Sequence, residues 1–125
     1  MNEEMFQQVF DEISPFLPEN WSRLLYRCFY TTGSWSMKFY VDRGTGEYVD
    51  CFKLAPSART KILQLFQHLD QIIASFRNRE PDNKKWTAMT LSVTENGDFH
   101  ADFGYTDLSE SSVHYTMEWE TKYLH

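Results

Sequence analysis

The residues whose types and spacing best suit chemistry in this sequence are Asp98, His100 and Asp102. Side chains two positions apart in a β-strand point to the same face, so a strand here would gather all three. Two carboxylates and an imidazole form a hard-to-borderline set of metal ligands. The alternative is that they are ordinary polar residues opposite an apolar strand face, or contacts to a partner. We favour the alternative, because metal sites usually take ligands from several elements and support them with further hydrogen bonds.

Other patterns for catalysis are weaker. Cys28 and Cys51 lie far apart without metal or redox spacing, which predicts buried thiols in a reducing compartment and leaves a disulfide between them open. Residues 44–46, Gly-Thr-Gly, lack the lysine and following helix of a phosphate-binding loop. We therefore predict a protein without catalytic activity, bound metal or cofactor.

The charge of the chain is concentrated in its last third. No Lys or Arg occurs between Trp86 and Thr121, and seven acidic residues lie there, so the formal net charge of -6 belongs almost entirely to this segment. Phosphate contacts need clustered Lys and Arg, so we expect no direct binding of nucleic acid. The acidity favours a basic protein partner, or serves solubility alone. The predicted partner-binding residues are the acids and their polar or aromatic neighbours: Glu95, Asp98, His100, Asp102, Tyr105, Asp107, Glu110, Tyr115, Glu118, Trp119 and Glu120.

Size and composition indicate one folded domain over residues 1–125. The 42% hydrophobic and 17% aromatic content is enough to build a core with large side chains. The first four residues, Met-Asn-Glu-Glu, are acidic and predict no secretory signal. No run approaches the roughly 20 apolar residues of a membrane span. We expect a cytoplasmic protein that binds no membrane.

Hydrophobic periodicity predicts two helices and at least five strands. Spacings of three and four indicate amphipathic helices over residues 3–17 and 57–76, the second with Ser57 as N-cap. Alternation and aromatic content indicate strands, and Asn96-Gly97 indicates a type I′ hairpin turn. Residues 112–124 alternate weakly and favour a sixth strand over a short helix. The other predicted strands cover residues 23–30, 35–41, 48–54, 86–93 and 99–105.

These elements predict an α+β fold. Short loops between sequential strands favour a mostly antiparallel sheet of five or six strands. The two amphipathic helices each need an apolar surface, so we expect both to pack on one face of that sheet.

Several segments resemble one known family. Residues 17–21, Leu-Pro-Glu-Asn-Trp, follow the first helix and are similar to the Pro-Glu-x-Trp joint of the YezG-like immunity protein family. Residues 86–91 and 97–108 resemble the central hairpin of that family. Residues 119–124, Trp-Glu-Thr-Lys-Tyr-Leu, resemble its C-terminal signature. The segments span nearly the whole chain in the family's order.

The resemblance implies an α+β antitoxin. Members bind and neutralise a cognate polymorphic toxin, typically a secreted bacterial nuclease, inside the producing cell. A nuclease presents a positive surface to phosphate, which an acidic protein can occupy with fast, steered association. The alternatives are a small metal-binding or hydrolytic domain using Asp98, His100 and Asp102, and an adaptor that associates through exposed aromatic residues. The toxin and the oligomeric state stay open.

Overall fold

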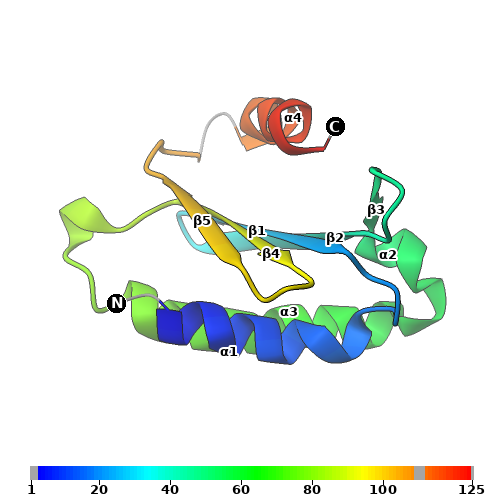
Figure 1. Ribbon diagram of the computed structural model, residues 1–125. Coiled ribbons are helices and arrows are strands. Elements are labelled where there is room, and N and C mark those ends of the chain that lie inside the picture. The colour runs from blue at the N-terminus through cyan, green and yellow to red at the C-terminus, as the bar shows by residue number, and fades with distance from the viewer. Residues whose placement is uncertain (1–2, 109–111, 125) are drawn as a thin grey trace.

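A five-stranded antiparallel sheet lies at the centre of the computed structural model, which describes residues 3–108 and 112–124 (Figure 1). The strand order is β3-β2-β1-β4-β5, so β1 is central and β3 and β5 are the edges. The predicted α+β fold is confirmed, with five strands. Their bounds are β1 (Arg23–Thr31), β2 (Ser34–Asp42), β3 (Tyr48–Asp50), β4 (Ala88–Thr94) and β5 (Phe99–Gly104).

Two long helices cover one face of the sheet, as predicted (Figure 1). These are α1 (Glu3–Ile13), extended by the 3-10 turn η1 (Ser14–Phe16), and α3 (Arg59–Arg77). The N-cap position of α3 is Ala58, with no side-chain cap, because the 3-10 turn η2 (Pro56–Ala58) takes up Ser57; the predicted N-cap is wrong. The core of this face includes Met5, Val9, Ile13, Leu24, Tyr26, Phe39, Ile62, Phe66, Leu69, Ile73, Met89 and Leu91.

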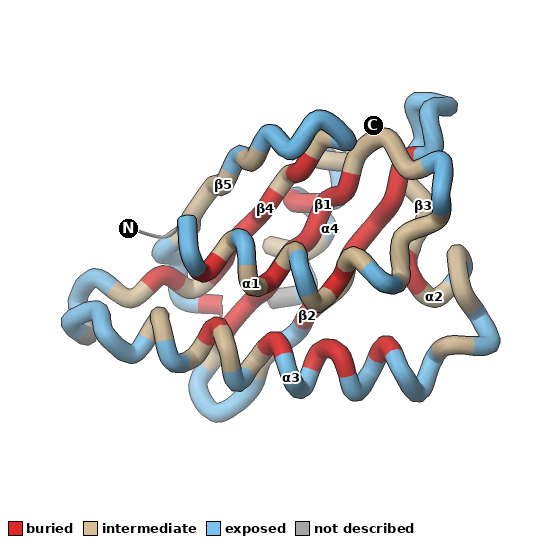
Figure 2. Tube along the Cα trace, turned by 60° about the horizontal axis from the view of Figure 1, so that its bottom comes forward, coloured by how far each residue is buried: buried red, intermediate tan, exposed pale blue. Residues whose placement is uncertain are grey.

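The central strand β1 is buried on both faces, and every residue from Leu24 to Tyr30 is buried (Figure 2). Leu24, Tyr26 and Cys28 belong to the core under α1 and α3, whereas Leu25 and Phe29 belong to a second cluster on the opposite face. A strand with two covered faces loses the polar half of its alternation.

The second face is covered by α4 (Ser112–Tyr123), so the predicted sixth strand is wrong (Figure 1). Tyr115, Trp119 and Tyr123 are four residues apart and all pack against the second cluster, which is the spacing of one helix face. The same residues also alternate between apolar and polar, as a strand would. The helix is favoured because α1 and α3 leave the second apolar face of the sheet uncovered.

The third strand is shorter than predicted. It ends at Asp50, whose carboxylate accepts a hydrogen bond from the Phe52 N–H at 2.9 Å and caps α2 (Cys51–Leu54). A short polar side chain at the N-cap accepts a hydrogen bond from a backbone N–H of the first helical turn, which has no partner within the helix. The chain therefore leaves the strand at this residue.

The β4–β5 hairpin is present, but its turn is not type I′. Gly97 has a φ of 88°, whereas no described non-glycine residue has a positive φ. The Gly97 N–H donates to the Thr94 carbonyl at 2.9 Å, as in a type I turn followed by a glycine bulge. A 3-10 turn, η3 (Asp82–Lys84), lies in the loop before this hairpin.

Cys28 and Cys51 are free and buried. Burial raises the pKa of the Cys28 thiol to about 12 and that of Cys51 to about 11, so both stay protonated and unreactive at neutral pH. Among the described residues, no helix has the length and apolar content to cross a membrane.

Candidate partner-binding surface

The strand β5 carries the pair His100 and Asp102 on the sheet face that α4 covers. They pair in register with Ser92 and Thr90 of β4. The His100 Nε2 atom lies 3.2 Å from Asp102 Oδ1, and the Tyr123 hydroxyl donates to Asp102 Oδ2 at 2.8 Å. Asp102 thus joins the edge strand to the end of α4.

Tyr123 stays a hydrogen-bond donor in this contact. Burial, and then the bond to Asp102, raise the pKa of the Tyr123 hydroxyl to about 12. The proton is therefore retained across the neutral range, and one carboxylate oxygen of Asp102 is committed to holding α4.

The structure brings together two of the three residues that suggested a metal site. Asp98 lies exposed in the β4–β5 turn and joins no such cluster. Within residues 3–108 and 112–124, no group of three or more His, Cys, Asp and Glu residues could hold a metal ion. The geometry therefore favours a structural and surface role for His100 and Asp102.

Trp119 is a core residue and not an exposed anchor. Its side chain is 4% exposed, and its Nε1–H donates to Thr90 Oγ1 at 2.8 Å. Its ring lies 5.6 Å from Tyr40 and 5.1 Å from Tyr123, centroid to centroid. Trp119 is among the partner-binding residues predicted from the sequence, whereas its burial in the folded protein leaves little of the side chain for a partner to contact.

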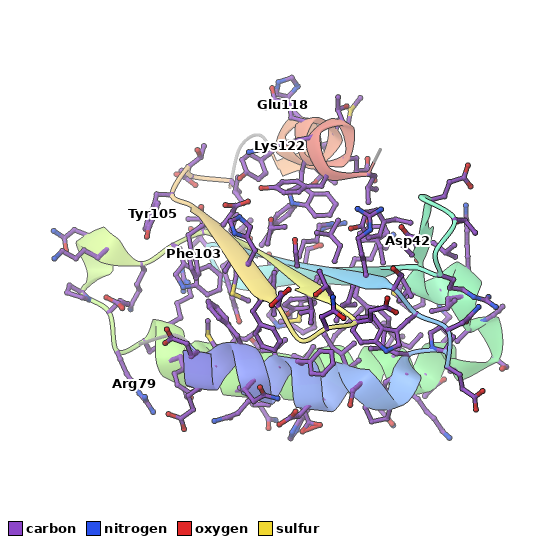
Figure 3. All side chains as sticks on the ribbon, in the orientation of Figure 1. Asp42, Arg79, Phe103, Tyr105, Glu118 and Lys122 are labelled. Atoms are coloured by element: carbon purple, nitrogen blue, oxygen red, sulfur yellow. The ribbon has the colours of Figure 1, made fainter. Side chains whose placement is uncertain are left out.

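Tyr115 is half-buried on the same side of α4. Its ring meets Phe29 edge-on, with centroids 5.3 Å apart. With Asp102, Glu118 and Lys122 it lines a pocket of about 360 Å³ between β5 and α4. Figure 3 shows Glu118 and Lys122 on α4 above the sheet.

The remaining acids fall at three places along the chain. Glu95 and Asp98 are exposed at the β4–β5 turn, Asp107 is exposed beyond the other end of β5, and Glu118 and Glu120 are exposed on α4. Glu110 lies outside the described residues. The described acids are therefore exposed at the hairpin turn, beyond the end of β5 and on α4.

Histidine and tyrosine side chains of the same segment have neighbours of both charges. The His114 Nε2 atom lies 2.7 Å from Glu118 Oε1 on the outer side of α4. Tyr105 is 62% exposed beyond the end of β5 (Figure 3) and lines a second pocket of about 360 Å³ with Arg77 and Lys84. Tyr105 thus stands on the surface between acidic and basic neighbours.

Two exposed apolar residues were missed by the sequence interpretation. Val113 is 75% exposed and Met117 is 60% exposed, both on α4. The two residues are four positions apart in the sequence. This spacing places them on one face of a helix, but it also places them on one face of a strand. Only a helical assignment of residues 112–123 separates them from Tyr115 and Trp119.

A family model for YezG-like immunity proteins matches residues 2–125, nearly the whole chain. None of the curated proteins matches the sequence.

Proposed function

Because the chain belongs to the family of YezG-like immunity proteins, we propose that it neutralises a secreted bacterial nuclease by covering that toxin's basic surface with the acids of residues 95–120. Membership in the family implies that it binds a cognate toxin and favours a non-enzymatic protein. The nuclease, the acidic contact and a place of action in the cytoplasm of the producing cell are our proposal.

The observation that carries the proposal is the exposure of several acids within one segment that lacks basic Lys and Arg side chains. No Lys or Arg occurs between Trp86 and Thr121. Four acids of the segment are well exposed and come from both the hairpin turn and α4: Glu95, Asp98, Glu118 and Glu120.

A one-signed surface of this kind suits a nuclease as partner. A nuclease binds phosphates through Lys and Arg. Those cations attract an acidic protein at separations up to about one Debye length. The attraction raises the association rate and orients the encounter before any close contact forms. Blocking the same cations would exclude the nucleic acid substrate.

The experiment compares two variants of equal charge. The first neutralises the segment with Glu95→Gln, Asp98→Asn, Glu118→Gln and Glu120→Gln. The control neutralises four exposed acids elsewhere, with Glu4→Gln, Glu19→Gln, Glu47→Gln and Glu80→Gln. The probe is the C-terminal toxic domain of a polymorphic toxin encoded beside this chain's gene, carrying a substitution that removes its toxicity.

We expect the first variant to associate about tenfold or more slowly with the probe at about 50 mM salt, and the control to lose much less. For the wild-type chain, the association rate falls as salt rises to about 500 mM, where screening is strong. Equal losses in the two variants would contradict the proposal, since they would trace the effect to net charge alone.

A further inference from the structure

The outer side of α4 carries an apolar pair that no contact within the protein explains. Val113 and Met117 are 75% and 60% exposed and stand one helical turn apart. The described residues include only two other large apolar side chains that are exposed, Leu63 and Tyr105. Two of the four therefore lie side by side on one helix.

This pair borders a groove of about 580 Å³ between α4 and the β1–β2 hairpin. Phe29 and Ser36 line it from the sheet, and Glu120 lines it from the helix together with Val113 and Met117. The groove is thus open, mostly apolar and continuous with the exposed surface of α4.

One acidic residue stands at the rim of the groove. Glu120 is exposed at its edge, and no Lys or Arg is among the described residues that line it. The guanidinium of Arg27 contacts Ser36 and the Phe29 ring, but Arg27 is 6% exposed and lies behind them. An apolar centre beside exposed charge is the anatomy of a protein–protein interface.

We propose that this groove is the apolar centre of the toxin interface. It takes apolar side chains of a toxin segment that carries Lys or Arg beside them, and those cations meet Glu120. The inference rests on the proposed function and deepens it, because it names a patch beside Glu120 from which the affinity arises.

The charge of Glu120 favours the toxin over a second copy of this chain as the occupant of the groove. A symmetric dimer through the groove would present the same patch from both copies, which places Glu120 of each in one interface. Like charges so close would oppose that dimer, whereas a basic partner relieves them.

The test uses the double variant Met117→Gln and Val113→Thr, which keeps side-chain size and charge while removing apolar surface. The matched control is Leu63→Gln on α3, on the other side of the sheet, where the side chain is 45% exposed. The probe is the same inactivated toxic domain, and thermal unfolding checks that each variant keeps the wild-type stability.

We expect the double variant to raise Kd about tenfold or more, mainly through faster dissociation, with the association rate and its salt dependence unchanged. The Leu63→Gln variant should bind within about twofold of the wild type, because its surface lies outside the groove. Neutralising the acids slows association instead, so the two sets of variants report on different steps.

Each other outcome overturns the inference in a recognisable way. If the wild-type chain does not bind the probe, the proposed function and the groove fall together. If the wild type binds and the double variant binds equally well, only the groove is wrong. If light scattering shows a wild-type dimer that the double variant dissociates, the groove belongs to a second copy of this chain.

Discussion

On the face of the sheet under α1 and α3 the buried side chains are almost all apolar, whereas the face under α4 buries polar groups among aromatic rings. Arg27 is 6% exposed on the α4 face, stacks over Phe29 and Trp119, and donates a hydrogen bond to Ser36 Oγ at 3.5 Å. Its Nε atom has no hydrogen-bond partner among the described residues.

The difference separates the two tasks of the molecule. The apolar face has many interchangeable contacts and stabilises the sheet. The α4 face relies on a few directional contacts, such as Trp119 to Thr90 and Tyr123 to Asp102. In our proposal, the α4 face also presents Glu118, Glu120 and the groove to a partner. We infer that stability resides mainly in the first face and recognition in the second.

The largest loss of stability is expected from Phe39→Ala. Phe39 is 1% exposed and meets the rings of Phe16 and Phe66 on the α1–α3 face. Removing the ring leaves a cavity in a densely packed core, so we expect the free energy of unfolding to fall by about 3–5 kcal/mol. Urea denaturation followed by circular dichroism measures the loss. A loss below about 1 kcal/mol would mean that this face is not the main stabilising core.

A smaller change, Trp119→Phe, tests the α4 face. The variant keeps an aromatic ring but removes the donor to Thr90, and we expect a loss of about 1–2 kcal/mol. Because α4 is held by few contacts, hydrogen exchange should quicken in α4 while β1 stays protected. Equal quickening in both elements would contradict the separation of the two faces.

The smallest effect is expected from Asp42→Asn, at the end of β2. The Asp42 carboxylate accepts from Arg23 at 2.6 Å and from the N–H groups of Gly44, Thr45 and Gly46. The bond from Arg23, foremost, holds the pKa of Asp42 below its usual value. At neutral pH we expect the variant to lose about 1 kcal/mol, since its amide still accepts from the backbone.

The direction of the Asp42 pKa shift determines how its contribution to the unfolding free energy changes with pH. A depressed pKa in the folded state contributes stability that is fully present above the unfolded pKa, near 4, and disappears as the pH falls through the folded pKa. The difference in unfolding free energy between wild type and Asp42→Asn should therefore shrink below about pH 4. Urea titrations from neutral to acidic pH measure it, and a constant difference would assign the effect to packing.

Local pattern was sufficient for most of the fold. The first helix, the long helix α3 and the hairpin around Gly97 follow from periodicity and turn chemistry, which neighbouring residues carry. The exposed positions of Glu95 and Asp98 in the turn could be predicted for the same reason. The turn type could not, because Asn96 tolerates either sign of φ and only the hairpin's hydrogen bonds select one.

The amino-acid sequence was sufficient to establish three features: the absence of Lys and Arg from residues 86–121, the α+β pattern of helices and strands, and the resemblance to the family. Tertiary structure alone decided that residues 112–123 form a helix, because their spacing fits both a strand and a helix and the bare second face of the sheet needed a cover. That decision buries Trp119 and exposes Val113 and Met117. Which side of a segment meets the core depends on a surface built from distant parts of the chain, so the apolar groove beside the acids exists only in the folded molecule.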